Sequence, residues 1–498
     1  MKKNRKSADA PPLSRRRFLG QASCAAVGTV ALCNTALNLG MLNTLACDAP
    51  NYKAMVCLFL SGGIDSFNLV VPSGQAEYDE YAAARADLAL PQDQLLPIVP
   101  ATPDGRQYGL HPGLPELQAL FEQGRVALLP NVGTLVEPTT MQQFRDRSVT
   151  LPLGLFSHSD QQMHWQTSMP DQRSAVGWGG RMADILQAGN CNQNISMNIS
   201  LSGNNVFQTG LMTSHYTISE NGSTGLRDYG EPSPSALIRS EAIDSLLGLI
   251  YQNLFEKTFA ARMRGAIDAH VEFSAAIEAV PPFQTQFSDT RLSRQFRMIA
   301  TTIAAREALG MRRQTFFVNT GGWDHHDEVL INQQNMLPVI SQALSEFQSA
   351  MEELGIADQV TTFTASDFGR TLSSNGRGSD HAWGGNHLVM GGAVAGGDMY
   401  GSYPSLYSGN PLDTGRGRLI PTTSVDELFA ELALWFGVPE PDLELVLPNV
   451  RRFYPAGSVV PPLGFLSAAA NQPAVRGRQE ELQRTRSGGG TSRAVRRR

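Results

Sequence analysis

Four short apolar runs, each leading into a glycine-rich or acidic loop, constrain the fold more than any other feature. They lie at residues 55–60, 126–129, 315–318 and 360–364. Each run is continuous rather than alternating, which is typical of strands buried on both faces of a parallel sheet. The sequence therefore predicts an α/β fold with a mostly parallel central sheet flanked by helices.

Apolar residues at helical spacing lie between and after these runs. They predict a helix over residues 337–354, with Pro338 in its first turn and Gly355 as its stop. A helix between two strands is the crossover unit of a parallel sheet. A second helix is expected over residues 426–438, capped by Thr423 or Ser424.

The middle of the chain has a different composition. An Asn-, Ser- and Gly-rich stretch, residues 190–205, precedes helical segments at 240–259 and 260–277. We interpret residues 190–300 as a helical insertion or cap over the active edge of the sheet. With this insertion, residues 47–465 are predicted to form one domain.

The first 46 residues have the pattern of an export signal. Basic residues precede a twin-arginine run at 14–19 (Ser-Arg-Arg-Arg-Phe-Leu), and an apolar stretch then extends without charge to Asp48. This pattern predicts a periplasmic or secreted protein, handled by the twin-arginine translocase and without a transmembrane anchor in the mature chain. Cleavage is expected near Ala46, and lipidation of Cys47 is the alternative.

Charge is unevenly distributed along the chain. Residues 1–46 hold seven Lys/Arg and one Asp, and residues 476–498 hold eight Arg and two Glu. The body between them has 25 basic and 43 acidic residues, a net charge of −18, which argues against nucleic acid as a partner. A small anionic substrate would need local cations, such as bound metals. The basic tail, residues 466–498, is predicted to be disordered.

Residues that can bind metal are concentrated in three loop motifs. Gly-Gly-Trp-Asp-His-His (321–326) and Ser-Asp-Phe-Gly-Arg-Thr (366–371) follow two of the runs, and Asp-His-Ala-Trp-Gly-Gly-Asn-His occupies 380–387. Ligands of parallel sheets lie beyond the carboxyl ends of the strands. Mixed carboxylate and imidazole ligands suit Zn, Mn or Fe. The candidate metal ligands are Asp65, Asp324, His326, Asp380, His381 and His387.

Each motif alone has a simpler interpretation. A single Asp–His pair is most often a hydrogen-bonded surface pair, and the same holds for His158 and His164. Asp367 could cap a following helix and Arg370 could pair with it. The joint pattern is what favours a metal site.

The motifs resemble those of the alkaline phosphatase-like, or sulfatase-like, superfamily. They are most similar to a bacterial branch of unassigned function with twin-arginine signals and motifs of the kind found here at 62–68, 321–326, 366–371 and 380–387. The resemblance spans about residues 50–460. It implies an alkaline phosphatase-like fold with two divalent metal ions, Zn in the first place and Mn or Fe as alternatives.

The resemblance also implies how the ligands divide between the two ions. One ion would take Asp324, His326 and His387, with His325 as a substitute because Asp324 and His326 are closer than usual in the superfamily. The other ion would take Asp65, Asp380 and His381.

A nucleophile is expected to bridge the two ions. By resemblance it falls near residues 156–162, where Ser157 is the first choice, with Ser159 and Ser66 behind it. A serine that only caps the helix is the alternative. Arg370 is expected to hold the anion, and the absence of Cys-x-Pro-x-Arg argues against a formylglycine sulfatase.

These features predict an exported, metal-dependent hydrolase of phosphate or related esters that uses a metal-activated serine. One alternative is a non-catalytic metal-binding protein in a periplasmic or extracellular complex. Another is a metal-dependent isomerase or transferase of phosphorylated compounds.

Overall fold

Strand β1 (Lys53–Leu60) lies within the main sheet, and all its residues after Lys53 are buried. Val56 and Leu58 pack into one hydrophobic core, whereas Cys57 and Phe59 pack into a second core on the opposite face. This explains why the run is apolar without alternation. The computed structural model describes residues 51–466, so the predicted signal, Cys47 and the predicted tail beyond residue 466 lie outside the described residues.

The main sheet has nine strands in the order β11-β5-β10-β9-β1-β8-β6-β7, with β12 beside β5. Neighbouring strands are parallel except where β10 pairs with β5 and β9. The bounds of the other strands are β5 (Val126–Gly133), β6 (Asn198–Ser200), β7 (Tyr216–Thr217), β8 (Arg313–Thr320), β9 (Val360–Ser366), β10 (Gly385–Gly391), β11 (Asp398–Met399) and β12 (Thr423–Ser424). The four predicted strands and the mostly parallel sheet are confirmed.

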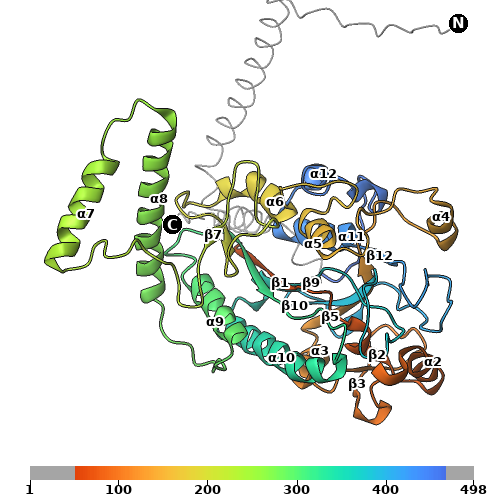
Figure 1. Cartoon of the computed structure of the whole chain (residues 1–498). Coiled ribbons are helices and arrows are strands. Elements are labelled where there is room, and N and C mark those ends of the chain that lie inside the picture. Colours follow the sequence, from red (N-terminus) through yellow and green to blue (C-terminus); the bar gives the residue numbers. More distant parts are fainter. Residues whose placement is uncertain (1–50, 467–498) are drawn as a thin grey trace, which may run out of the picture. The chain divides into compact units, whose positions relative to one another are not determined.

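Helices cover both faces of this sheet (Figure 1). One face carries α3 (Pro115–Glu122), α9 (Arg291–Ala304) and α10 (Val329–Glu353). The other carries α5 (His158–Thr167), α6 (Trp178–Leu186), α11 (Val425–Phe436) and α12 (Leu443–Val446). A small antiparallel sheet is made of β2 (Val70–Pro72), β4 (Tyr108–Leu110) and β3 (Leu96–Ile98), and helix α2 (Gln75–Arg85) packs on β2. Helix α4 (Met141–Asp146) lies elsewhere and packs on Trp383 through Phe144.

Several predicted helix boundaries are corrected by the structure. Helix α10 begins at Val329, so Pro338 lies inside the helix rather than in its first turn. The N-terminal extension contains polar residues, which hid it from the apolar pattern. Helix α11 is capped by Ser424, whose capping box with Glu427 satisfies two backbone N–H groups. No helix follows Asp367, because the chain continues there as a loop.

Residues 190–300 contain both sheet and helix. Strands β6 and β7 belong to the main sheet, and α9 packs on α10. Helices α7 (Pro234–Leu247) and α8 (Leu254–Glu278) stand away from the sheet, and the break between them lies at 248–253 rather than near 259. The interpretation of this region as a cap stays a prediction. Within residues 51–466, no helix is long and apolar enough to cross a membrane.

Candidate metal centre

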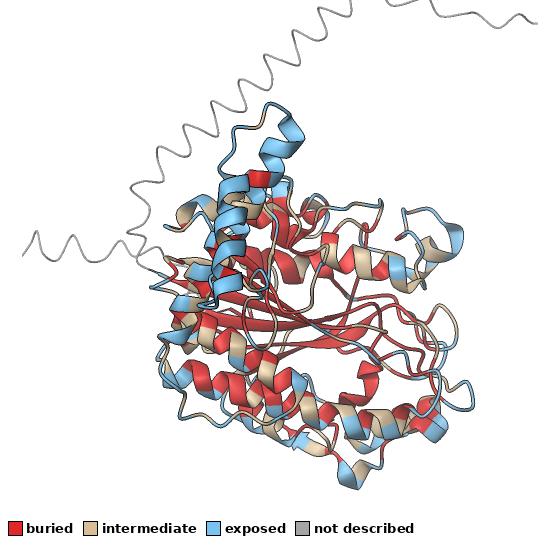
Figure 2. Ribbon diagram, turned by 60° about the vertical axis from the view of Figure 1, so that its left-hand side comes forward, coloured by how far each residue is buried: buried red, intermediate tan, exposed pale blue. Residues whose placement is uncertain are grey.

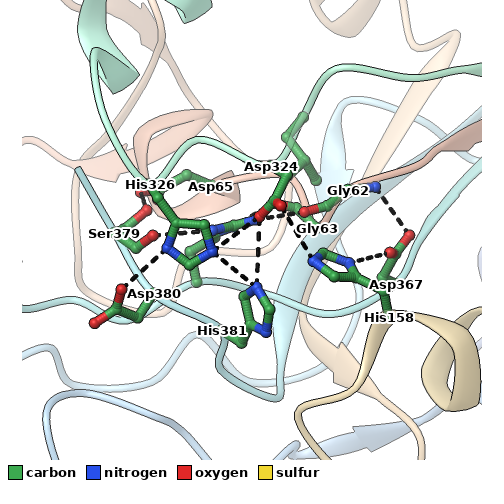
Figure 3. Close-up of polar contacts among 12 residues, drawn as sticks. Gly62, Gly63, Asp65, His158, Asp324, His326, Asp367, Ser379, Asp380 and His381 are labelled. Carbon is green, nitrogen blue, oxygen red and sulfur yellow. Dashed lines mark hydrogen bonds and ion pairs between the residues drawn. The ribbon is translucent and has the colours of Figure 1, made fainter.

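Three imidazoles surround the carboxylate of Asp324 where loops from distant parts of the chain meet (Figure 3). Asp324 and His326 come from the loop after β8, and His381 comes from the segment between β9 and β10. His158 is the first residue of α5. The ligand atoms of His158, Asp324 and His381 all lie within 4.8 Å of one another.

His158 is oriented by a buried carboxylate. Its Nδ1 lies 2.6 Å from Oδ2 of Asp367. The same carboxylate accepts hydrogen bonds from the Gly62 backbone N–H at Oδ1 (3.1 Å) and from Gln162 at Oδ2 (2.9 Å). Because a carboxylate only accepts, the proton of His158 is on Nδ1. Its Nε2 is buried without a hydrogen-bond partner and lies 3.4 Å from Oδ2 of Asp324. With its proton on Nδ1, the ring can bind a metal ion through Nε2.

His381 and His326 are oriented in the same way. His381 donates from Nδ1 to the backbone carbonyl of Phe156 (2.8 Å), and Nδ1 of His326 lies 3.1 Å from Oδ1 of Asp380. Since these partners are acceptors, a proton on each Nδ1 leaves the Nε2 atom free to bind a metal ion. The two Nε2 atoms lie 3.0 Å apart, and they lie 3.4 Å and 3.1 Å from Oδ1 of Asp324.

A cation among these nitrogen and oxygen atoms would be bound by their lone pairs. Ligands about 2.0–2.1 Å from a tetrahedral zinc ion lie about 3.3 Å from one another, close to the separations found here. Three imidazoles and one carboxylate are also the ligand types that zinc and similar ions prefer. His158, Asp324 and His381 therefore fit as ligands of one transition-metal ion, and His326 lies beside them against Asp324.

The electrostatics of the site keep its groups in the metal-binding form. Burial acts to raise the pKa of Asp324, but Arg370 and the neighbouring histidines outweigh it and lower the pKa below its usual value. Burial, together with Arg370, lowers the pKa of His381. Burial also opposes ionisation of Asp380, yet hydrogen bonds from Asn375, Arg416 and His326 lower its pKa to about 2. These carboxylates are ionised and His381 is neutral at pH 7.

Arg370 positions Asp324 instead of presenting free donors to an anion. Its guanidinium is fully buried and donates to the carbonyls of Gly63 (2.7 Å), Ser379 (2.9 Å) and Gly62. Its Nη2 also contacts Oδ1 of Asp324. The expected pairing with Asp367 is absent from its contacts, because Asp367 serves His158.

The other sequence-predicted residues lie around the centre or away from it. Asp380 stands behind His326. Asp65 is buried and accepts hydrogen bonds from Arg85 (2.8 Å) and Ser379 (2.7 Å). His387 lies in β10, where it packs on Trp165 with ring centroids 4.6 Å apart, and burial lowers its pKa to about 3. The two implied ligand sets are thus not assembled as expected.

Ser157 is the N-cap of α5. Its hydroxyl accepts from the Asp160 backbone N–H (3.5 Å) and lies 3.2 Å from the Ser159 hydroxyl. Ser157 therefore caps the helix, and its role as a nucleophile stays a prediction. Its neighbours Phe156 and His158 both contribute to the centre.

His158 is the site residue that sequence reasoning missed. A usable signal was its spacing from Gln162, since residues four apart lie on one face of a helix and both reach Asp367. No strand-end motif marks it, because it comes from the start of a helix.

Comparison with known proteins gives a family and distant structural likenesses. The PsFucS1 sulfatase from Pseudoalteromonas sp. is 9% identical, with 72% of this chain and 66% of that chain covered and a TM-score of 0.31. The C-terminal periplasmic domain of EcEptC from Escherichia coli, in complex with Zn, is 10% identical (85% and 96% covered, TM-score 0.32). The lipoteichoic acid synthase LtaP from Listeria monocytogenes is 9% identical (84% and 76% covered, TM-score 0.29).

Structural similarity this distant gives no evidence about the activity of this chain. No curated protein matches the sequence. The model of a family described as a protein of unknown function (DUF1501) matches residues 52–438. By this match over most of its length, the chain belongs to the DUF1501 family.

Proposed function

We propose that this chain is a metal-dependent hydrolase of phosphate or related esters. The observation that carries the proposal is the convergence of three imidazole nitrogens on the carboxylate of Asp324. A divalent ion bound there would polarise an ester oxygen and lower the pKa of a bound hydroxyl. One ion is supported by these residues, in place of the two implied by resemblance.

The exposure of the centre is suited to a substrate. The side chains of Asp324 and His326 are 47% and 45% exposed, so one side of the centre is open to solvent. Structural metal sites are closed by protein ligands, whereas catalytic ones keep an open position. An ester could therefore approach the ion while its other side is held by His158.

Two arginines beside the centre replace Arg370 as candidate anion-binding groups. Arg416 lies 2.6 Å from Asp380 and keeps a partly exposed side chain, and Arg418 donates to the His381 carbonyl at 2.9 Å. In a body with a net charge of −18, this local positive charge would attract an anionic ester to the centre.

Ser157 is proposed as the nucleophile. It lies between Phe156, whose carbonyl orients His381, and His158. The serine oxygen would bond to phosphorus, the ester alcohol would leave with a proton, and water would then release the phosphate. An attacking water without Ser157 is the competing form of the same hydrolysis.

The place of action is also a proposal. The twin-arginine run and the apolar stretch after it support export to the periplasm or beyond the cell by the twin-arginine translocase. Export in the folded state would allow the metal to be bound before translocation.

Metal content and turnover of the exported protein test the proposal. Wild type is compared with Asp324→Ala, His381→Ala and a control, His215→Ala, whose side chain contacts Asn204 instead of the centre. We expect about one transition-metal ion per chain, lost in the first two variants and kept in the control, with hydrolysis of an aryl phosphate monoester or diester. Metal without turnover would favour the non-catalytic alternative, and no metal would overturn both.

A further inference from the structure

Helices α7 and α8 expose most of their surface (Figure 2). Ala236 is the only residue of α7 that is buried, and the first six residues of α8, 254–259, are all exposed. The C-terminal half of α8 packs on the body through residues such as Phe273. We call α7 and α8 together the hairpin, and residues 237–259 its tip. The tip therefore has little contact with the rest of the described chain.

The exposed tip is strongly apolar. Ile250 is 91% exposed and Phe255 is 83% exposed. Six more large apolar side chains are at least half exposed in the same segment: Leu237, Ile238, Leu246, Leu249, Leu254 and Phe259. Between the helices lies a groove of about 650 Å³, lined by Ile243, Leu247, Tyr251, Phe255, Phe259 and Met263 among others.

A patch of this size marks an interaction site. Since a large side chain such as Phe carries about 150–250 Å² of surface, the eight exposed side chains present on the order of 1,000 Å². Monomeric proteins rarely expose contiguous apolar patches above about 300–600 Å². A stable interface buries about 800 Å² on each partner. The tip is therefore large enough to hold a protein dimer together.

Charge favours protein over membrane as the occupant. Residues 234–278 hold four Lys/Arg and six Asp/Glu, whereas helices that lie on membranes are rich in Lys and Arg. The body charge of −18 would add repulsion from anionic lipid.

We propose that two copies of this chain associate through α7 and α8. Each hairpin offers both a groove and projecting apolar side chains, so one surface can complement itself across a two-fold axis. The four helices would then form an antiparallel bundle whose core is built from the exposed side chains. This association is independent of the metal centre and of the proposed hydrolysis.

Sedimentation velocity and light scattering of the chain without its first 46 residues test the association. We expect about twice the mass of one chain across the micromolar range. Ile250→Glu and Phe255→Glu should reduce it to the mass of one chain, because each places a charge in the buried core. Phe255→Leu should keep the dimer, and Val99→Glu, at a site 86% exposed elsewhere, should have no effect.

Circular dichroism identifies variants that fail to fold. The mass of the wild-type chain tests the association without any substitution. A wild-type chain with the mass of one copy throughout the range would overturn the proposal. So would a dimer that survives both glutamate variants, or a monomer that binds neutral lipid vesicles through the tip.

Discussion

At the scale of single residues, the positions of protons decide what the centre can bind. Nδ1 of His158 donates to the Asp367 carboxylate, and Nδ1 of His381 donates to the Phe156 carbonyl. Both partners can only accept a hydrogen bond. Both Nε2 atoms face Asp324 and can bind a metal ion when the protons are on Nδ1. The acceptors behind the imidazoles are as much a part of the centre as the imidazoles themselves.

Substitution of Asp367 by Asn tests this orientation. The amide keeps the volume but has no charge and can donate, so it holds the Nδ1–H of His158 less firmly. We expect Asp367→Asn to lower metal affinity by about 10–100-fold, as is usual for partners behind a metal-binding histidine. Chelator competition measures the affinity. Asp160→Asn, in the same helix but paired with Arg173, is the control and should bind as wild type.

A pair of substitutions separates the two roles of Ser157. Ser157→Ala removes the cap and costs about 1 kcal/mol of stability, whereas Asn caps about as well as Ser. If Ser157 is the nucleophile, both variants should lose at least about 10³-fold in kcat, as removal of a catalytic serine does. Kinetics and denaturant unfolding measure the two effects. Full activity in Ser157→Asn would leave water as the nucleophile.

Single residues also show where sequence reasoning reached its limit. Asp324, His326 and His381 were predicted because each falls in a loop near the end of a strand, and the structure brings them together. Arg370 was expected at the substrate, yet its buried donors bind carbonyls, and burial of this kind has no local sequence pattern.

At the scale of elements, β10 explains why His387 does not join the other candidates. A strand that starts with glycine, Asn and His lacks the apolar run that identified β1, β5, β8 and β9. The strand lies antiparallel between β5 and β9, and alternation turns His387 onto Trp165 of α5. The sequence pattern predicts strands that are continuous apolar runs, and it misses strands that begin in a polar loop motif.

The N-terminus of α11 contains a buried acid that couples stability to pH. Burial raises the pKa of Asp426 to about 7, despite hydrogen bonds from Ser168 and Ser424. Its unfolded pKa is about 3.9. The folded chain thus binds this proton more tightly, so the stability it contributes is complete below about pH 4 and is lost as the pH rises towards 7.

Asp426→Asn should remove this dependence, since the amide resembles the protonated acid in shape and charge. We expect the free energy of unfolding of the variant to exceed that of wild type increasingly between pH 4 and 7. Denaturant unfolding at several pH values measures the difference. Parallel curves for the two proteins would show that Asp426 is already ionised in the fold.

At the scale of the whole molecule, the centre exists only because the sheet brings distant loops together. His158 and Asp324 are far apart in sequence. Helix α5, which carries His158, packs on β9, whereas β8, which precedes Asp324, pairs with β1 and β6. The apolar runs predict which loops meet at one edge of the main sheet. Which side chains meet there depends on the direction from which each helix approaches that edge. That direction is a property of the packed fold, which is why α5 was linked to the site by resemblance and not by periodicity.

Because the ligands meet only in the folded chain, metal binding should stabilise the fold. A ligand that binds only the native state adds about 2.7 kcal/mol at a free concentration one hundred times its Kd. We therefore expect Zn²⁺ to raise the unfolding temperature and a chelator to lower it. Differential scanning calorimetry with and without chelator measures this shift.

Two variants make the stabilisation specific to the proposed centre. Asp324→Ala should lose the response to Zn²⁺, because it removes the carboxylate shared by all three imidazoles. His270→Ala should keep it, since that side chain contacts Ser223 and Ser274 in another part of the fold. An equal response in both variants would assign the metal to surface residues elsewhere. A loss confined to Asp324→Ala would tie stability to the same contacts that are proposed to support hydrolysis.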